Sequence, residues 1–333
     1  MLPSVNNIAR ARAHSNIAFI KYWGNRDHNL RLPANSSLSM NLGELHTTTT
    51  VEWIQAFDAD TLEINGSPAE QGALERVRAH LDVIRRRLAI QSFAQVTSTN
   101  NFPMGTGIAS SASAFAALTM AAVAAPGAEL SERELSALAR MGSGSAARSI
   151  PAGFVEWHAG DSHETSYAET FAHPDHWDLV DVIAVVSRRH KHVGSSAGHR
   201  EADSSILQAA RAGSAEQRLS DVKAAIVSRD FEAFASIVEE DSNLMHAVMM
   251  TSNPPLFYWD PLSLRVMRAV RSWRTAGRLR VCYTLDAGPN VHCICEAADA
   301  AAVADNLREL SANIEIIRSG AGPGAYVLPT MAV

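Results

Sequence analysis

Residues 101–113 read Asn-Phe-Pro-Met-Gly-Thr-Gly-Ile-Ala-Ser-Ser-Ala-Ser, and they decide which fold the rest of the chain can form. The β-branched run 95–99 before them predicts a strand, and the apolar run 112–125 after them predicts a buried helix. A strand that passes through glycines into a helix leaves several backbone N–H groups without partners inside the helix. These donors and the positive end of the helix dipole favour an anion, most commonly phosphate.

The same residues are also compatible with a Gly-rich turn in front of a Ser-capped core helix. They match neither the Walker phosphate loop nor the dinucleotide-binding fingerprint. However, Asn-Phe-Pro-x-x-x-Gly-Ile-Ala-Ser-Ser-Ala resembles the phosphate loop of the GHMP small-molecule kinases, and most closely that of the mevalonate diphosphate decarboxylases. The resemblance implies that ATP is held by Pro103, Gly105, Thr106, Gly107, Ile108, Ala109, Ser110 and Ser111, with Ser110 also a ligand of Mg²⁺.

The beginning of the chain carries polar residues inside an apolar strand. Residues 9–24 end in Asn-Ile-Ala-Phe-Ile-Lys-Tyr-Trp-Gly, and Asn16 and Lys21 would be costly to bury without partners. One interpretation is an edge strand whose lysine extends to solvent, and the other is the wall of a binding site. The pattern, continued by residues 32–39, resembles the opening signature of the same decarboxylases, which favours a site.

A second Gly/Ser-rich stretch, residues 142–153, ends in an arginine and a short run, Arg-Ser-Ile-Pro-Ala-Gly. A flexible surface loop is one interpretation. Arg148 favours the other, because a guanidinium can hold a carboxylate or a phosphate through two parallel hydrogen bonds. Gly-Ser-Gly-Ser-Ala-x-Arg-Ser, followed by Gly-Phe-Val-Glu-Trp, again resembles the family.

The C-terminal half contains Thr-Leu-Asp-Ala-Gly-Pro-Asn at residues 284–290, between two predicted strands at 280–285 and 291–295. Alone, this segment predicts a turn stabilised by the side chain of Asp286. As Thr-x-Asp-Ala-Gly-Pro-Asn it is the strongest C-terminal resemblance to the family. Residues 193–199 are expected to form a loop whose Ser-Ser-x-Gly portion also fits.

These resemblances span the whole chain and imply an α+β protein with the GHMP kinase fold. The expected N-terminal α/β domain, of the ribosomal protein S5 domain 2-like type, covers residues 1–187. An α+β domain covers residues 188–333, and the active site lies in the cleft between them. The boundary is placed just beyond a predicted buried strand at 180–186.

The family uses ATP and Mg²⁺ to phosphorylate the 3-hydroxyl of a 5-phosphorylated mevalonate, and then loses phosphate and CO₂ to form an isopentenyl product. The resemblance implies catalytic roles for Asp286, Lys21, Asn16 and Arg148, and substrate contacts for Tyr22, Ser143, Ser145, Arg148 and Ser196. Asp286 would orient the 3-hydroxyl or accept its proton, and would stabilise positive charge that develops at C3. Lys21 would contact the transferring phosphoryl oxygens, and Arg148 the carboxylate that leaves.

Two departures from the family pattern concern the phosphate end of the substrate. Asn25 stands where the family usually has lysine, while Ala197 and His199 stand where it usually has arginine and methionine. Because fewer cations suit a less charged ligand, we expect a preference for the 5-monophosphate. Arg26 or Lys191 could compensate, so the 5-diphosphate stays open.

Two other functions are compatible with parts of the pattern. A GHMP-type mevalonate kinase would phosphorylate without decarboxylation, and a regulatory protein of this fold would bind a ligand without turnover. The joint presence of Lys21, Arg148, Asp286 and the phosphate loop argues against both.

Composition excludes several other classes. The 333 residues are 47% hydrophobic with a net charge of −6, so a sizeable core is expected and nucleic acid is not an expected partner. No apolar run is long enough for a membrane span, and the N-terminus does not resemble a secretory signal. The three cysteines, Cys282, Cys293 and Cys295, are expected to be reduced core thiols in a cytoplasmic protein. The family resemblance also suggests a homodimer.

Further helices are predicted at 199–212, 215–228, 231–250, 262–274 and 298–310. A helix at 74–88 is expected to expose its arginines to solvent. The threonines at 47–50 are expected to lie on a strand surface.

Overall fold

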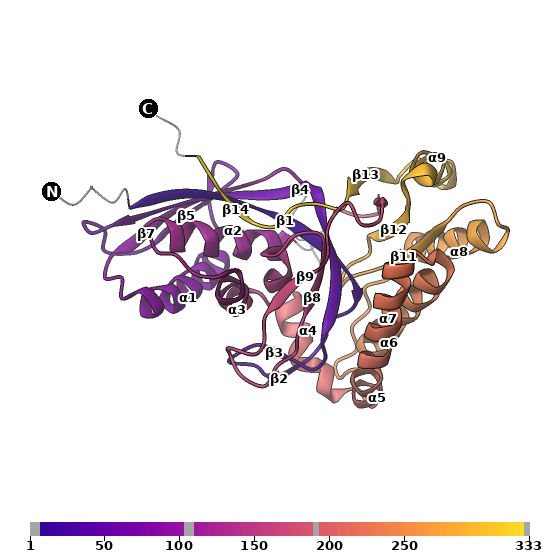
Figure 1. The fold of residues 1–333 in the computed structure, drawn as a ribbon, viewed down its shortest axis with the longest axis horizontal. Coiled ribbons are helices and arrows are strands. Elements are labelled where there is room, and N and C mark those ends of the chain that lie inside the picture. The colour runs from indigo at the N-terminus through magenta and orange to yellow at the C-terminus, as the bar shows by residue number, and fades with distance from the viewer. Residues whose placement is uncertain (1–6, 103–109, 189–192, 330–333) are drawn as a thin grey trace.

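The computed structural model describes residues 7–102, 110–188 and 193–329 and has the predicted mixed α+β architecture (Figure 1). Within these ranges the strands form an eight-stranded sheet, a four-stranded sheet and a two-stranded hairpin. The hairpin strands are β2 (Asn25–Asp27) and β3 (Leu32–Pro33).

The eight-stranded sheet is built on two long antiparallel strands, β1 (Ile8–Ile20) and β4 (Ser37–Ile54). One half of β4 continues the sheet through β7 (Phe93–Asn100), β5 (Thr61–Ile64) and β6 (Ser67–Pro68). The other half pairs with β8 (Phe154–Trp157), which pairs with β9 (Ala168–Ala172). β14 (Tyr326–Leu328) returns from the end of the chain to pair with β1.

Three helices cover one face of this sheet: α1 (Gln71–Leu88), α2 (Ser110–Ala124) and α3 (Glu132–Gly142) (Figure 1). α2 is apolar around most of its circumference because it is buried between the sheet and the other two helices. The indole of Trp53 on β4 donates a hydrogen bond to the carbonyl of Ala122, at 3.0 Å. A capping box of Ser131 and Glu134 starts α3.

Three of the four threonines at residues 47–50 are not on the surface, and for these the prediction is wrong. Thr47, Thr48 and Thr49 are buried, because α2 and the neighbouring strands enclose this part of β4. The hydroxyl of Thr47 lies 2.7 Å from that of Ser113 on α2 and donates to the side chain of Asn100, at 2.6 Å. These hydrogen bonds satisfy polar groups whose burial would otherwise be costly.

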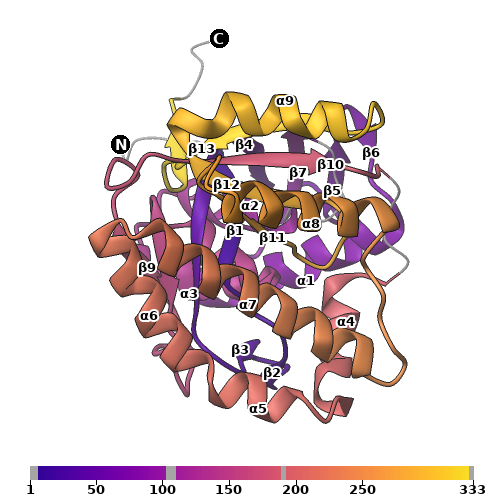
Figure 2. The same cartoon turned by 90° about the vertical axis from the view of Figure 1, so that its right-hand side faces the viewer.

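The four-stranded sheet has the order β11 (Val281–Thr284), β12 (Val291–Glu296), β10 (Leu179–Val185) and β13 (Glu315–Gly320). α8 (Pro261–Thr275) and α9 (Ala300–Leu310) pack on one face and lie in front of it in Figure 2. α6 (Ala215–Ser228) and α7 (Phe231–Thr251) pack on the other. The three cysteines are free and buried in these cores, as predicted.

Residues 193–199 are not a loop. Residues 195–199 belong to α4 (Ser195–Glu201). A 3-10 turn, Ala202–Ser204, and α5 (Gln208–Gly213) follow it. The single helix predicted at 199–212 is therefore two shorter helices. Gly198 allows α4 to approach the ring of Trp23, since a Cβ at this position would lie 2.5 Å from it.

The two sheets share one hydrophobic core, formed where β1 and β4 meet β10, α6 and α7. Strands on both sides of the expected boundary at 187/188 pair with the opposite part of the chain: β10 lies in the second sheet and β14 in the first. The division at that residue stays a prediction. Among the described residues, no helix combines the length and hydrophobicity that a bilayer span requires.

Candidate active site

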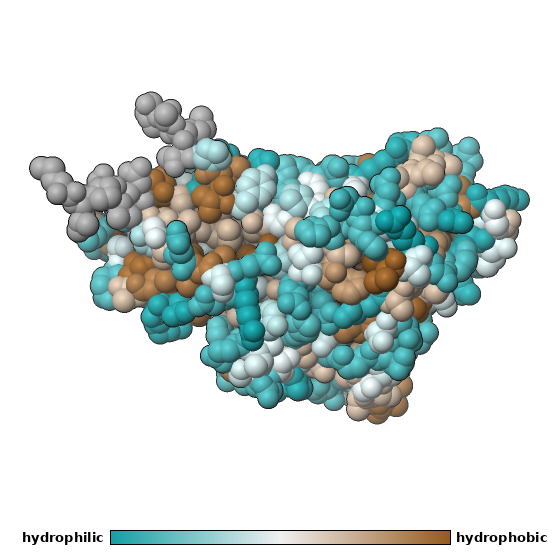
Figure 3. Space-filling view, viewed as in Figure 1, coloured by the Kyte–Doolittle hydropathy of each residue, from teal (hydrophilic) through white to brown (hydrophobic). Residues whose placement is uncertain are grey.

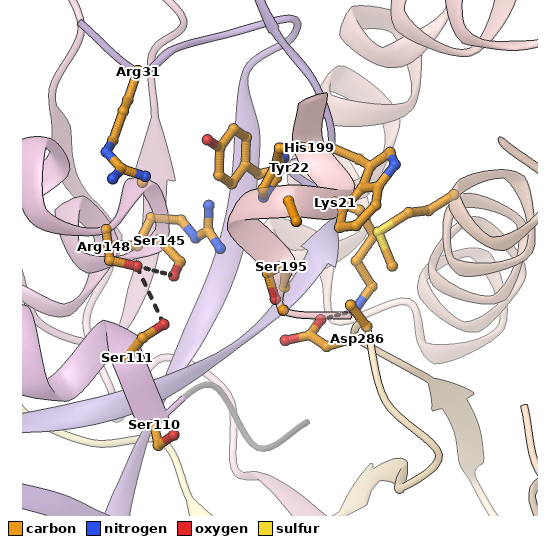
Figure 4. A pocket seen from close by; sticks show the side chains of 18 of the residues that line it. Lys21, Tyr22, Arg31, Ser110, Ser111, Ser145, Arg148, Ser195, His199 and Asp286 are labelled. Atoms are coloured by element: carbon orange, nitrogen blue, oxygen red, sulfur yellow. Dashed lines mark hydrogen bonds and ion pairs between the residues drawn. The ribbon is translucent and has the colours of Figure 1, made fainter. Parts of the chain in front are cut away.

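A cavity of about 510 Å³ lies where the two halves of the chain meet. The end of β1, the start of α2, the 3-10 helix η1 (Gly144–Ser149), α4 and the loop after β11 all contribute to its lining. Figure 4 shows Lys21 and Asp286 at one side of this cavity, with Ser110, Ser111 and Arg148 across from them. Segments far apart in the sequence therefore face a common space.

The central contact is an ion pair between Lys21 and Asp286. The Lys21 Nζ lies 2.7 Å from Asp286 Oδ1, although 265 positions separate the two residues in the sequence. The lysine side chain is 1% exposed and the aspartate side chain 26% exposed, so the carboxylate is the more accessible member of the pair.

The two charges adjust each other's ionisation. Burial has the largest single effect and raises the pKa of the Asp286 carboxyl, but the charge and hydrogen bond of Lys21 and other nearby charges such as Arg148 together outweigh it, so the pKa lies below its ordinary value. Burial lowers the pKa of Lys21, and the Asp286 charge opposes this change. Asp286 is therefore ionised at neutral pH and available to accept a hydrogen bond.

The backbone of Lys21 is fixed by three side chains of the C-terminal half and one of the N-terminal half. Its N–H donates to Asp241 Oδ2 on α7 at 2.6 Å, and Asp241 Oδ1 accepts from Arg218 on α6 at 2.8 Å. Its carbonyl accepts hydrogen bonds from Arg211, at 2.7 Å, and from Asn35, at 3.1 Å. Asp241, Arg218 and Arg211 were not predicted, because an aspartate or arginine within an amphipathic helix gives no local sign of a distant partner.

Arg148 and Asn16 form a second buried group. Arg148 donates to Ser37 Oγ at 2.7 Å and to Asn16 Oδ1 at 3.3 Å. Asn16 in turn donates to Ser149 Oγ at 2.8 Å. Arg148 lines the cavity and Asn16 does not, so Asn16 holds the guanidinium in place. Burial lowers the pKa of Arg148 to about 10, which leaves it cationic at neutral pH.

A row of hydroxyls connects the start of α2 to η1. Ser143 Oγ lies 3.2 Å from Ser111 Oγ and 3.4 Å from Ser145 Oγ, and all three residues line the cavity with Ser110. The dashed lines in Figure 4 follow this row. Such hydroxyls can donate to phosphate oxygens.

The two departures from the family pattern lie beside Tyr22. The Tyr22 hydroxyl donates to Asn25 Oδ1 at 2.6 Å, and burial raises the pKa of this phenol to about 12. His199 stacks on the Tyr22 ring at 4.1 Å and packs against Trp23 at 4.5 Å. The N–H of Gly24 donates to His199 Nδ1 at 3.0 Å, so this imidazole is held on three sides.

Three arginines that the sequence interpretation did not place in the site also line the cavity: Arg31, Arg76 and Arg200. Arg76 belongs to the arginine-rich face of α1 that was expected to face solvent, and its guanidinium lies 5.1 Å from the Phe115 ring centre. The spacing along α1 could not separate the one arginine that reaches the cavity from those that do not.

Several predicted residues lie outside the described residues: Pro103, Gly105, Thr106, Gly107, Ile108, Ala109 and Lys191. Ser196 belongs to α4, but its side chain is likewise outside the description. Its neighbour Ser195 lines the cavity.

The charges of the cavity favour a polyanionic ligand. Of the residues that the structure describes, five cations line it, namely Lys21, Arg31, Arg76, Arg148 and Arg200, against one carboxylate, Asp286. Within the described ranges no group of three His, Cys, Asp or Glu side chains could hold a metal ion. The arrangement can bind phosphate groups at the hydroxyls and arginines and place a ligand hydroxyl against Asp286.

Family models match both halves of the chain. Residues 13–168 match the diphosphomevalonate decarboxylase-like N-terminal domain, and residues 181–320 match the mevalonate 5-diphosphate decarboxylase C-terminal domain. Diphosphomevalonate decarboxylase of Ganoderma lucidum is 39% identical over 306 residues, which cover 85% of this chain and 76% of that protein. The human enzyme is 38% identical over 299 residues, which cover 83% and 73%.

Solved structures give the same result. Mevalonate diphosphate decarboxylase from Staphylococcus aureus superposes with a TM-score of 0.91 at 37% identity, over 97% of this chain and 98% of that chain. The complex of MDDEF with MVAPP, AMPPCP and magnesium superposes with a TM-score of 0.92 at 37% identity, over 97% and 99%. These matches confirm the predicted GHMP kinase-like fold. The chain belongs to the diphosphomevalonate decarboxylase family.

Proposed function

We propose that this protein catalyses the ATP-dependent decarboxylation of a 5-phosphorylated mevalonate. The observation that carries the proposal is the Lys21–Asp286 pair at 2.7 Å, placed in one cavity with the start of α2 and with Arg148. A carboxylate that faces a hydroxyl, and cations that face phosphates, are the groups that phosphoryl transfer to an alcohol requires.

The residues present fit ATP and Mg²⁺. Ser110 and Ser111 lie in the first turn of α2, where hydroxyls and backbone N–H groups can hold phosphate oxygens. Mg²⁺ commonly binds few protein ligands and takes the rest from phosphates and water, which agrees with the lack of an acidic cluster in the described ranges. When bound, Mg²⁺ would neutralise charge on the transferring phosphate. The related MDDEF complex contains AMPPCP and magnesium.

In the first step the 3-hydroxyl oxygen bonds to the γ-phosphorus of ATP, and the bond from that phosphorus to the ADP oxygen breaks. Asp286 accepts a hydrogen bond from the hydroxyl, orients it and receives its proton as the new bond forms. Lys21 lies beside the same carboxylate and offsets negative charge on the phosphoryl oxygens.

In the second step the C3–O bond breaks and phosphate leaves. Asp286 returns its proton to the departing phosphate, and the carboxylate that results stabilises the positive charge that develops at C3. The C1–C2 bond breaks as CO₂ departs, and its electron pair forms the C2–C3 double bond of the product. Arg148 holds the carboxylate until that bond breaks, in an orientation set by Asn16 and Ser37.

We further propose a preference for mevalonate 5-phosphate over the 5-diphosphate. The side chain of Asn25 is hydrogen-bonded to Tyr22, and Ala197 contributes no charge to the lining. Arg26 does not compensate, since its guanidinium donates to the carbonyls of Pro33 and Gly160 and it is not among the lining residues.

Turnover assays with mevalonate 5-phosphate and with the 5-diphosphate test the decarboxylase proposal and the monophosphate proposal separately. Turnover of either one with CO₂ release supports the decarboxylase, and kcat/KM for the monophosphate is expected to exceed that for the diphosphate at least about tenfold. A large preference for the diphosphate would remove the monophosphate proposal and leave the decarboxylase intact. Phosphorylated product without CO₂ would favour the mevalonate kinase instead. The expected homodimer and cytoplasmic location stay predictions of the family resemblance.

A further inference from the structure

We propose that Arg31 binds the 5-phosphate of the substrate and provides a positive charge that Asn25 and Ala197 do not provide. This inference rests on the proposed function and concerns the end of the cavity away from the reacting atoms. Arg31 lies in the turn between β2 and β3 and lines the cavity, and its guanidinium points toward Arg148 and Ser145 in Figure 4.

The guanidinium is anchored but has donors to spare. Arg31 Nε donates to the carbonyl of Met141, at the end of α3, at 3.0 Å. Within the described ranges, its two terminal nitrogens make no hydrogen bond or ion pair with the protein. A guanidinium held at Nε presents those nitrogens as a fixed fork, which suits two oxygens of one phosphate.

The position of Arg31 suits the substrate phosphate better than the nucleotide. In Figure 4 Arg31 and Ser110 lie at opposite ends of the view, and Asp286 lies on the far side from both. A substrate with its 3-hydroxyl at Asp286 would extend its phosphate past Tyr22 toward Arg31, while nucleotide phosphates would occupy the start of α2. Tyr22 and Arg76 line the same cavity as Arg31.

The backbone at Arg31 supports a functional role. Its φ is 49°, in the left-handed region that residues other than glycine and asparagine rarely adopt. With this φ, an arginine makes the folded protein less stable than a glycine or an asparagine would. Residues in such unfavourable backbone conformations concentrate at ligand-binding sites. The same property supplies a suitable test, because Arg31→Asn removes the charge without adding backbone strain.

The experiment compares wild type, Arg31→Asn and the matched control Arg26→Asn. Both arginines belong to the β2–β3 hairpin, but Arg26 is bound to backbone carbonyls and does not line the cavity. KM for mevalonate 5-phosphate, KM for ATP and kcat would be measured by coupled ADP release, with thermal unfolding as a check of the fold. Arg31→Asn is expected to raise KM for mevalonate 5-phosphate about tenfold or more, since charge-assisted hydrogen bonds are lost.

The remaining readouts separate phosphate binding from other effects. Arg31→Asn should change kcat and KM for ATP less than about threefold, and unphosphorylated mevalonate should inhibit both proteins equally. The proposal would be overturned by an unchanged KM for mevalonate 5-phosphate or by a rise in KM for ATP alone. It would also be overturned if the affinity for unphosphorylated mevalonate fell as much as the affinity for mevalonate 5-phosphate.

Calorimetric titration with mevalonate 5-phosphate keeps this inference distinct from the proposed function. If wild type binds the compound but releases no CO₂, the proposed function fails, and the affinity ratio of wild type to Arg31→Asn still decides the role of Arg31. A ratio near one overturns it, and a ratio of about ten or more supports it. A wild type that binds no phosphorylated mevalonate contradicts both.

Discussion

Asp286 and Lys21 show how two ordinary side chains acquire unusual properties from their surroundings. The lysine side chain is almost fully buried, and the carboxylate is the more exposed member of the pair, although both residues line the cavity. Breaking such a pair leaves an uncompensated buried charge, which is costly. Substitutions here therefore change both charge balance and catalysis, and each test needs a stability control.

Asp286→Asn should lower kcat about a thousandfold, because the amide neither takes the hydroxyl proton nor stabilises positive charge at C3. KM for the substrate should change less than tenfold, since the phosphate contacts remain. Release of ADP and CO₂ measures both. Asp305→Asn is a suitable control because it removes an exposed ion pair with Arg308, and it should leave kcat unchanged. Near-normal turnover by Asp286→Asn would refute the assigned role.

Two buried histidines give the protein a predicted sensitivity to acid. Burial lowers the pKa of His80 and of His246 to about 3, so both are neutral in the folded protein and bind protons only after unfolding above that pH. Their contribution to stability is complete above pH ~6.5 and falls as the pH drops toward 3. When the pH is lowered from 7.5 to 5, each of the two histidines should lower the free energy of unfolding by about 2 kcal/mol.

Urea unfolding at the two pH values tests this. His80→Gln keeps a group that can bond to Thr119, whose hydroxyl lies 2.8 Å from His80 Nε2, but it does not titrate. The variant should lose about 2 kcal/mol less than wild type over the same pH interval. An identical pH dependence in both proteins would show that His80 is not the titrating group.

At the scale of elements, α4 is the clearest difference between prediction and structure. Its sequence, Ser-Ser-Ala-Gly-His-Arg-Glu, contains serines and a glycine that favour turns, and this misled the local prediction. The helix is stabilised by tertiary contacts: Gly198 approaches Trp23, and His199 packs between Trp23 and Tyr22. Such packing overrides weak local propensity.

Gly198→Ala tests whether this packing positions the site. The new Cβ would lie 2.5 Å from the Trp23 ring and 3.3 Å from Leu256, so α4 or the indole must shift. We expect a lower Tm and a several-fold higher substrate KM, because α4 lines the cavity. Gly213→Ala is the matched control, since its Cβ would meet nothing within 4 Å. Equal behaviour of both variants would contradict the role assigned to α4.

At the scale of the whole molecule, periodicity and turn residues predicted most strands and helices, and the family resemblance predicted how the halves meet. The contact of Lys21 with Asp286 follows from no local pattern, since the two residues lie 265 positions apart. The helices that fix the Lys21 backbone through Asp241 and Arg211 were predicted as helices, but their partners were not. Long-range polar contacts depend on the complete fold, and this is why the sequence alone left them undetermined.

The central claim is that the cavity between the two halves couples phosphoryl transfer to loss of CO₂. The most direct measurement is the amount of ADP and CO₂ released in the same reaction of wild type with ATP and mevalonate 5-phosphate, repeated with the 5-diphosphate. The account predicts equal amounts of ADP and CO₂ with at least one of them. ADP release without CO₂, or CO₂ release that does not need ATP, would contradict it.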